Sequence, residues 1–296
     1  RGQESAGIVS YDKKNFHAER RMGLVSDNFT KSRVLDTIIG SSAIGHVRYS
    51  TTGGSQLKNV QPLFADLSSG GIALAHNGNL TNGLQLRDEL VSIGSIFQST
   101  SDTETIIQLM ARSTKKGKTI TRLIDALSKI EGAYALVALT MKKLIGVRDP
   151  DGIRPLVIGS LDGRYILASE TCALDIIGAE FVREVENGEI VVITEEGIES
   201  IKPFPQKKPR PCIFEYIYFS RPDSISNGQS VYDCRKAFGR QLAIESPTEA
   251  DLVIPVPDSG VPAAIGYAQE ANVPFELGII RNHYVGRTFI EPTQNI

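Results

Sequence analysis

The sequence lacks the features that membrane proteins, disulfide-bonded secreted proteins and nucleic-acid-binding proteins need. None of its apolar runs approaches the ~20 residues of a membrane span. Its net charge of -2 gives no argument for a nucleic-acid or acidic-membrane partner. It has only three cysteines, odd in number and far apart, which suits a reducing cytoplasm better than a disulfide framework. We therefore expect a cytoplasmic globular protein, and its 296 residues suffice for one large domain or two ordinary ones.

Both ends of the sequence are abrupt. It begins at Arg1 without an initiating methionine, and it stops at Ile296 without a terminal helix or a polar tail. We expect a fragment that is cut at both ends.

Residues 1–202 show the pattern of an α+β domain rich in antiparallel strands. The stretch "GGIALAHNGNL" alternates apolar and small residues into Asn77-Gly78, a dipeptide that readily makes tight turns. Further on, "DPDG" and "SLDG" divide an apolar run into short strands, which is typical of a meander. The stretch "GEIVVITEEGIESI" predicts one more hairpin.

Two helices are predicted in the same region. In "SDTETIIQLMARST", Ser101 and Glu104 have the spacing of a capping box. In "TITRLIDALSKIEG", apolar residues recur at helical spacing, and Gly132 is expected to stop the helix.

A second domain is expected after a proline-rich linker. The stretch "KPFPQKKPRP" predicts a boundary near residues 202–211, because no helix or central strand tolerates so many prolines. In residues 203–296, "ADLVIPV" predicts a buried strand, "VPAAIGYAQEA" a helix with Pro262 in its first turn, and "FELGII" the next strand. This βαβ order predicts an α/β domain with a parallel sheet.

Three short motifs carry side chains suited to one kind of substrate. Arg48 in "GHVRYSTTG" can grip a carboxylate, Asn77 and Gly78 in "AHNGNL" can donate to an oxyanion, and Asp102 in "SDTE" can hold an ammonium. Each has an ordinary alternative when read alone: a surface arginine, a hairpin turn, and an acidic first helical turn. Together they suit a free α-amino acid whose side-chain carbonyl is attacked.

The order of these motifs resembles a known family. "RGQESAGI", "GHVRYSTTG", "AHNGNL", "SDTE", "DPDGIRPL" and "ASET" follow one another as in glutamine amidotransferases of the N-terminal-nucleophile (Ntn) class. With "CIFEYIYFSRPDS" and "RNHYVGRTFI", the resemblance narrows to the amidophosphoribosyltransferase family. It implies an Ntn-hydrolase αββα sandwich over residues 1–202 and the beginning of a type I phosphoribosyltransferase domain over 203–296. The expected substrates are glutamine and phosphoribosyl pyrophosphate (PRPP).

The resemblance also assigns roles in the glutamine domain. It places Arg48 and Thr51 at the glutamine α-carboxylate, Asp102 and Gly78 at its α-amino group, and Asn77 with Gly78 in the oxyanion hole. Arg1 matches an arginine near the nucleophile. That nucleophile is an N-terminal cysteine, expected roughly two dozen residues before Arg1, with its own α-amino group as the base.

The three cysteines of the chain are not candidates for the nucleophile. Cys172 and Cys234 are interpreted as small packed side chains. Cys212 matches a position that ligates a [4Fe-4S] cluster in some family members. The three other ligands of that cluster would lie beyond Ile296, and without a second cysteine nearby the favoured interpretation of Cys212 is a buried thiol.

In the second domain the resemblance implies a PRPP site. The loop "PDSG" lies between a strand and a helix start, a place that favours phosphate. The resemblance makes Asp258, Ser259 and Gly260 a pyrophosphate loop, and it makes Tyr284, Arg287 and Thr288 the tip of a flexible catalytic loop. Mg²⁺ is expected with PRPP. The acidic PRPP motif of the family is absent from the sequence, which adds to the expectation of a fragment.

These observations favour a truncated amidophosphoribosyltransferase, inactive by itself and homo-oligomeric like its relatives. A glucosamine-6-phosphate synthase or an asparagine synthetase would share only the first domain, and "RPDS" and "YVGRTFI" speak against both. A protein of another class, which binds glutamine or PRPP without turnover, stays open as an alternative.

Overall fold

A computed structural model describes residues 4–30, 32–48, 56–115 and 117–282. By its contacts the chain forms two units. Unit 1 holds the described residues up to Leu156 together with Val185–Arg210, and unit 2 holds Val157–Glu184 with the described residues from Pro211 onward. Residues 202–212 form no helix or strand, as the proline-rich stretch predicts. The grouping of residues 157–184 with the second unit was not apparent in the sequence.

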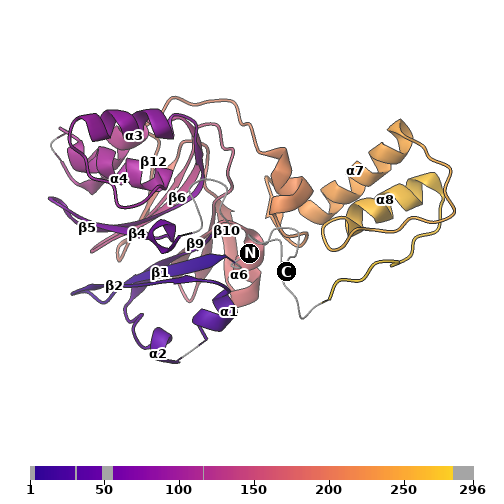
Figure 1. Cartoon of the computed structure of the whole chain (residues 1–296), viewed down its shortest axis with the longest axis horizontal. Coiled ribbons are helices and arrows are strands. Elements are labelled where there is room, and N and C mark those ends of the chain that lie inside the picture. The colour runs from indigo at the N-terminus through magenta and orange to yellow at the C-terminus, as the bar shows by residue number, and fades with distance from the viewer. Residues whose placement is uncertain (1–3, 31, 49–55, 116, 283–296) are drawn as a thin grey trace. The chain divides into compact units, whose positions relative to one another are not determined.

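Unit 1 is built on two antiparallel sheets (Figure 1). The smaller sheet has the order β2-β1-β3, with β1 at Ser5–Tyr11, β2 at Phe16–Met22 and β3 at Ser42–Arg48. The larger has the order β12-β11-β7-β6-β5-β4. Its strands are β4 (Leu63–Leu67), β5 (Gly70–Leu80), β6 (Gly132–Thr140), β7 (Leu144–Arg148), β11 (Ile190–Thr194) and β12 (Gly197–Ile201).

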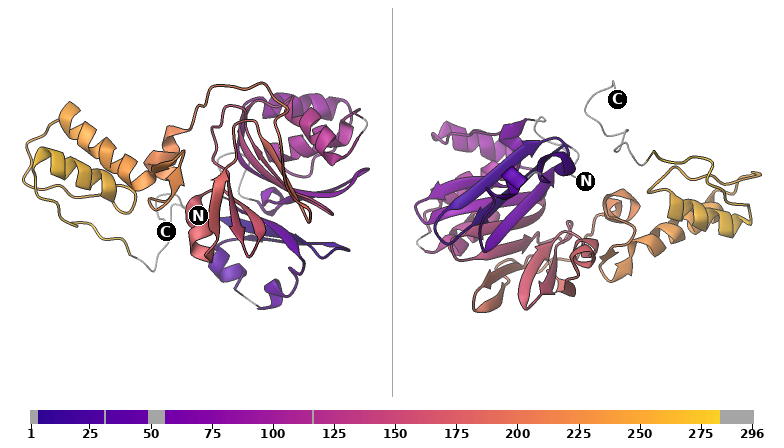
Figure 2. Two further views of the ribbon diagram at one scale, coloured as in Figure 1. Left: turned by 180° about the vertical axis from the view of Figure 1, so that it is seen from behind. Right: turned by 90° about the horizontal axis from the view of Figure 1, so that it is seen from below.

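The helices of unit 1 cover the outer faces of the two sheets. Beside the larger sheet lie α3 (Gly83–Ser92), α4 (Asp102–Arg112) and α5 (Thr119–Leu127). Beside the smaller sheet lie the short helices α1 (Val25–Asn28) and α2 (Ser32–Leu35). A 3₁₀ turn, η1 (Leu57–Asn59), precedes β4. The four layers are seen one above another in Figure 1 and from behind in Figure 2.

Strand alternation assigns the side chains of β5 to two different cores. Ile72 and Leu74 pack with the helical layer, whereas Ala73 and Ala75 pack against the smaller sheet. This period of two is what a strand buried on both faces requires. The αββα sandwich expected for this part of the chain is therefore confirmed.

The two predicted helices exist, but their ends differ from the prediction. Ser101 is the N-cap of α4 and accepts from the Thr103 N–H at 3.3 Å. Glu104 does not close the capping box; its carboxylate accepts from the Gln98 N–H at 2.8 Å and from the Ser99 N–H at 2.6 Å. Helix α5 ends at Leu127, before Gly132, which begins β6.

The predicted turn at Asn77-Gly78 is wrong. Both residues lie inside β5, where Asn77 pairs with Ala135 and Gly78 with Tyr134 of β6. The pairing of two long strands outweighs the local turn preference of the dipeptide. The other predicted turns are present: "DPDG" closes with a hydrogen bond from the Gly152 N–H to the Asp149 carbonyl, and "SLDG" joins two paired strands.

Unit 2 contains a small antiparallel sheet of order β10-β8-β9. Its elements are β8 (Val157–Leu161), β9 (Arg164–Ala168), α6 (Thr171–Ile177), β10 (Glu180–Glu184), a π-helical turn η2 (Glu215–Phe219), the short pair β13 (Ile225–Ser226) and β14 (Gln229–Ser230), and the helices α7 (Val231–Glu245) and α8 (Val261–Ala271). Glu170 ties the two parts of this unit together, because its carboxylate accepts from the Arg221 N–H at 2.7 Å and from the Ser224 hydroxyl at 2.9 Å.

The prediction of two buried strands around α8 is wrong for the described residues. Val253 and Phe275 form a single parallel bridge, and no strand develops on either side of it. Ile254 is 45% exposed and Val256 is 64% exposed. Strands of a parallel sheet are normally buried on both faces. The exposed side chains beside this single bridge do not meet that condition. The helix itself is confirmed, with Pro262 in its first turn.

Cys172 lies in α6 and is 4% exposed, so its interpretation as a small packed side chain is confirmed. Among the described residues, no helix combines the length and the apolarity that crossing a membrane requires.

Candidate functional site

The free edge of β5 is the centre of the candidate site. Strand β4 pairs only with residues 70–74 of β5. Beyond that point side chains take over: the His76 N–H donates to Gln61 Oε1 at 2.6 Å and the Leu80 N–H to Asp102 Oδ2 at 2.9 Å. Alternate residues of a strand direct their N–H groups to the same edge, so the Gly78 N–H points there too. Among the described residues it has no acceptor on that edge.

Gly78 is required at this position by space and by backbone conformation. Its φ of 151° lies outside the range that L side chains favour. A Cβ built on it would overlap the Ala133 carbonyl and would lie 2.8 Å from His76 Nε2. The backbone of β6 and the His76 ring therefore leave no space for a side chain at residue 78. The Gly78 N–H lies between those of His76 and Leu80, which are both hydrogen-bonded.

Asp102 places a carboxylate beside this N–H. It begins α4, its Oδ2 accepts the Leu80 N–H, and its Oδ1 lies 3.6 Å from His76 Nδ1. Burial raises the pKa of Asp102, but the hydrogen bond and charge of His76 and the N–H groups of Leu80 and Thr103 outweigh it, so the net shift is downward. Asp102 is therefore ionised at neutral pH and can hold a cation.

Arg48 ends β3 and is only 7% exposed. Its Nη1 lies 4.0 Å from Glu4 Oε1. Burial lowers the pKa of Arg48, and the charges of Glu4 and Asp102 act against that shift. The guanidinium still carries its charge at neutral pH, because arginine does not lose its proton in proteins.

His46, two residues before Arg48, is a partly buried neighbour of this charge. Burial, and to a lesser extent the neighbouring His76 and Arg48, lower its pKa to about 4. His46 is therefore neutral at pH 7, which spares the buried interior a second positive charge beside Arg48.

Asn77 presents a carboxamide next to Gly78. Its Oδ1 accepts a hydrogen bond from Arg154 Nη2 at 2.7 Å. Arg154 follows the "DPDG" turn, and its N–H donates to Asp149 Oδ2 at 3.2 Å. The structure thus brings together Asn77, Gly78 and Asp102 around one edge of β5, with Arg48 at the end of the facing sheet. Arg1 and Thr51 lie outside the described residues.

The predicted pyrophosphate loop lies where the sequence placed it, directly before α8. The Gly260 N–H donates to the Val256 carbonyl at 3.2 Å, and a Cβ on Gly260 would come within 2.6 Å of that oxygen. Asp258 pairs with Arg281 at 2.6 Å, and this ion pair is exposed. Tyr284, Arg287 and Thr288 lie outside the described residues.

The described residues do not assemble a metal centre. Cys172, Cys212 and Cys234 are all free thiols, and no group of three or more metal-binding side chains is found in the described part of the chain. Cys212, the candidate ligand of an iron–sulfur cluster, is partly exposed and belongs to no group of three or more metal-binding side chains among residues that the structure describes. The described residues therefore do not fit a [4Fe-4S] cluster.

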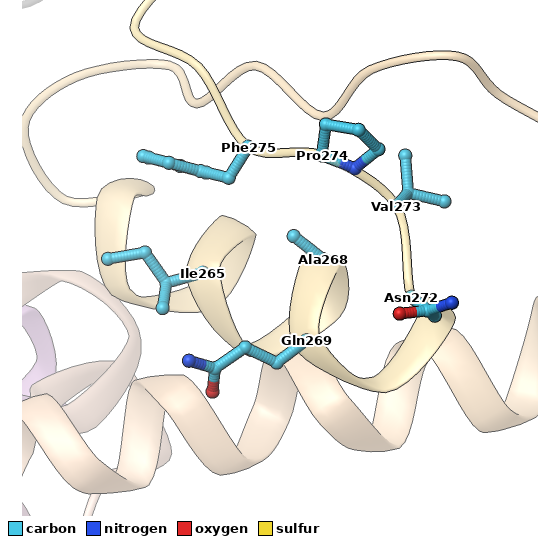
Figure 3. A pocket seen from close by; sticks show the side chains of 7 residues that line it. All are labelled: Ile265, Ala268, Gln269, Asn272, Val273, Pro274 and Phe275. Atoms are coloured by element: carbon cyan, nitrogen blue, oxygen red, sulfur yellow. The ribbon is translucent and has the colours of Figure 1, made fainter.

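A hollow on unit 2 offers little chemistry. It lies along α8 and the segment after it, and two side-chain amides, Gln269 and Asn272, are its only polar side chains (Figure 3). No titratable side chain lines it. We assign no role to it.

Several residues of the site were not recognised in the sequence. His46 and His76 lie inside the motifs "GHVRYSTTG" and "AHNGNL", but no role was predicted for either of them. Glu4 gave no signal beyond its place in "RGQESAGI". Arg154 is separated from Asn77 by 77 residues, and only the unexplained motif "DPDGIRPL" pointed to it.

Comparison with known proteins places these motifs in one family. The profile of the glutamine amidotransferase domain matches residues 46–175. The whole chain is 59% identical over 301 residues to the amidophosphoribosyltransferase of Rhizobium etli, and 53% identical over 298 residues to the chloroplastic one of Glycine max. The chain belongs to the amidophosphoribosyltransferase family.

A solved structure agrees with this assignment. The glutamine PRPP amidotransferase of Bacillus subtilis, solved with ADP and GMP, superposes with a TM-score of 0.90 at 46% identity and covers 99% of the chain. The chain spans only part of these amidophosphoribosyltransferases: 60% of the Rhizobium etli protein, 52% of the Glycine max protein and 63% of the Bacillus subtilis chain.

Proposed function

We propose that the free edge of β5 binds glutamine, and that the whole protein transfers the amide nitrogen of glutamine to PRPP. The products are 5-phosphoribosylamine, pyrophosphate and glutamate, in the first committed step of de novo purine biosynthesis. The observation that carries this proposal is the Gly78 N–H, which has no acceptor on that edge among the described residues, between the occupied N–H groups of His76 and Leu80, with the Asp102 carboxylate beside it.

Each end of a glutamine molecule finds a matching group at this edge. Asp102 holds the α-ammonium, and Arg48 holds the α-carboxylate, with Thr51 as a further contact. The side-chain carbonyl then lies against the Gly78 N–H and the Asn77 amide, which are the donors of an oxyanion hole. Arg1 would lie near the nucleophile.

The reaction at this edge is acyl transfer. A cysteine thiolate, which the family resemblance places before Arg1, adds to the side-chain carbonyl, and negative charge develops on the oxygen that Gly78 and Asn77 face. The intermediate collapses, the C–N bond breaks, and the departing nitrogen takes a proton and leaves as ammonia. Water then hydrolyses the thioester to glutamate and restores the thiol.

The acceptor half is proposed for unit 2. The loop Asp258–Gly260 at the start of α8 would bind the pyrophosphate of PRPP, and Tyr284, Arg287 and Thr288 would close over it. Magnesium is expected to arrive with PRPP. The described residues hold no assembled carboxylate site for this ion, and we assign no step to it. Association of the chain with copies of itself also stays a prediction.

Two measurements test the proposal. Calorimetry on this chain should detect glutamine binding, and Asp102→Asn should weaken it. The full-length protein that carries this sequence should release pyrophosphate from PRPP only when glutamine or ammonia is present. Absence of that release would refute the assigned reaction.

A binding protein without turnover is the alternative to this proposal. All three cysteines belong to unit 2, and none is among the residues of the β5 edge. If the full-length protein binds glutamine but forms no glutamate, this alternative is correct.

A further inference from the structure

The contact between Arg154 and Asn77 determines which way the Asn77 carboxamide faces. Arg154 Nη2 lies 2.7 Å from Asn77 Oδ1. An arginine side chain has hydrogen-bond donors and no acceptor. The atom that it binds must therefore be the amide oxygen, which leaves the NH₂ group of Asn77 as the part that can donate elsewhere.

Without this contact the carboxamide has two orientations. The terminal torsion of asparagine is broad and roughly two-fold, so the oxygen and the nitrogen exchange places with a half turn. In one orientation Nδ2 is available to a developing oxyanion, and in the other Oδ1 would face it and repel it. Arg154 removes the second orientation, because Oδ1 turned away from the guanidinium would lose a charge-assisted hydrogen bond.

The backbone at Arg154 is itself anchored on both sides of the peptide. The Arg154 N–H donates to Asp149 Oδ2 at 3.2 Å, and the Arg154 carbonyl accepts from Arg148 Nε at 3.0 Å. Asp149 is fully buried and also accepts the Tyr134 N–H at 3.3 Å. Tyr134 is the residue paired with Gly78 across β5 and β6. The loop that carries Arg154 is thus anchored to the strand pair that carries Asn77 and Gly78.

We propose that Arg154 is a positioning residue that holds the Asn77 carboxamide with its NH₂ group directed to the reacting carbonyl. This inference rests on the proposed function of the β5 edge. It also gives the motif "DPDGIRPL" a role: Asp149 fixes the loop, and Arg154 orients the oxyanion donor. The positive charge of Arg154 on Oδ1 further polarises the amide and strengthens its N–H as a donor.

The test measures glutamine hydrolysis by the full-length protein that carries this sequence. Loss of one oxyanion donor typically costs 10²–10³ in kcat. Arg154→Gln should therefore lower kcat roughly 10- to 100-fold and leave KM for glutamine within about twofold. Arg154→Lys, which keeps a charged donor, should lie between Arg154→Gln and the unmodified protein. Arg112→Gln, an exposed change at the far end of α4, is the matched control and should have no effect.

A double-mutant cycle separates positioning from a general structural role. If Arg154 acts through Asn77, the double variant Arg154→Gln/Asn77→Ala should be no more than about twofold slower than Asn77→Ala alone. Losses that multiply, or an effect of Arg154→Gln confined to KM, would refute the inference. If the unmodified protein hydrolyses no glutamine, the proposed function fails instead, which is a distinguishable result.

Asn77→Asp tests the contact should Arg154→Gln not fold. This variant gives Arg154 a charged partner, so the midpoint of thermal unfolding should hold or rise while hydrolysis is lost. A clear fall of that midpoint would show that residue 77 and Arg154 do not pair.

Discussion

The two candidate sites of this chain differ in how their polar groups are held. At the β5 edge, Asp102 and Arg48 are largely buried and bind or face groups of the surrounding sheets and helices. In the loop before α8, Asp258 has one exposed partner, Arg281, and the neighbouring apolar residues Ile254 and Val256 are open to solvent.

This difference shows that only one of the two candidate sites is already formed within the described residues. A binding site is preorganised when buried neighbours fix each side chain before the ligand arrives. The β5 edge meets that condition, and the loop of unit 2 does not. Substitutions at the first site should therefore have large effects on binding and stability, and those at the second should have small ones.

The largest effect is expected for Gly78→Ala. The new methyl group would overlap the Ala133 carbonyl and the His76 ring, so β5 or β6 has to move. We expect the free energy of unfolding to fall by at least about 3 kcal/mol in urea titrations, and glutamine binding to be lost. Gly94→Ala is the matched control: Gly94 also has a positive φ, of 87°, but no atom lies near its added Cβ. It should cost only about 1–2 kcal/mol, which is the backbone contribution.

The second largest effect is expected for Asp102→Asn, which should weaken the binding of glutamine. Loss of a buried charge that pairs with a ligand ammonium typically costs 2–5 kcal/mol, so the Kd for glutamine should rise roughly 30-fold or more by calorimetry. Asp88→Asn, a similar change at an exposed position of α3, should leave Kd unchanged. Because the pKa of Asp102 lies below its ordinary value, binding should be constant near neutral pH and weaken only in acid. Equal affinities of the two variants would contradict the assignment of Asp102.

His46 should make unit 1 sensitive to mild acid. Its pKa of about 4 in the folded chain lies below the ordinary value of 6.5, so protons bind more tightly to the unfolded chain. The stabilisation is complete above pH 6.5 and declines as the pH falls toward 4. Between pH 7 and pH 5 the loss should be about 2 kcal/mol in urea titrations. His46→Gln should flatten this dependence, and an unchanged slope would refute the origin assigned to it.

The smallest effect is expected for Arg281→Gln in unit 2. Its ion pair with Asp258 is exposed, and such pairs contribute about 0–1 kcal/mol. The unfolding midpoint should hardly change. Arg235→Gln is the buried counterpart in the same unit, because Arg235 donates to the Ser220 carbonyl at 2.7 Å and is 2% exposed. It should cost about 2 kcal/mol or more. Similar losses for the two arginines would remove the contrast between exposed and buried contacts.

Local sequence patterns predicted those elements whose cause is local. Helices α4, α5 and α8 follow from caps and apolar spacing, and the β8–β9 hairpin follows from its turn residues. The errors arose where distant parts of the chain decide. Asn77-Gly78 favours a turn by itself, yet β6 holds it in a strand. The strands expected around α8 failed because pairing partners beyond one bridge are not present among the described residues.

Only those residues of the site that lie in recognisable sequence motifs could be predicted. Arg48, Asn77, Gly78 and Asp102 were identified by residue type and by resemblance, and the structure brings them together. Arg154 could not be found in this way, because its contact spans 77 residues and depends on how the loop after β7 folds back. The burial that makes His46 neutral likewise exists only once the two sheets have packed together.

Because successive residues of β5 face opposite sides, an odd change in its length has a different effect from an even change. Odd and even residues of the strand face different neighbours, and Gly78 reaches the open edge only because it is an even number of residues from His76 and Leu80. Removing one residue between Ile72 and His76 would send the edge N–H groups into the ladder with β6 and exchange the two cores. Removing two would restore the alternation in a shorter strand. The fold should therefore tolerate removal of two residues from this strand better than removal of one.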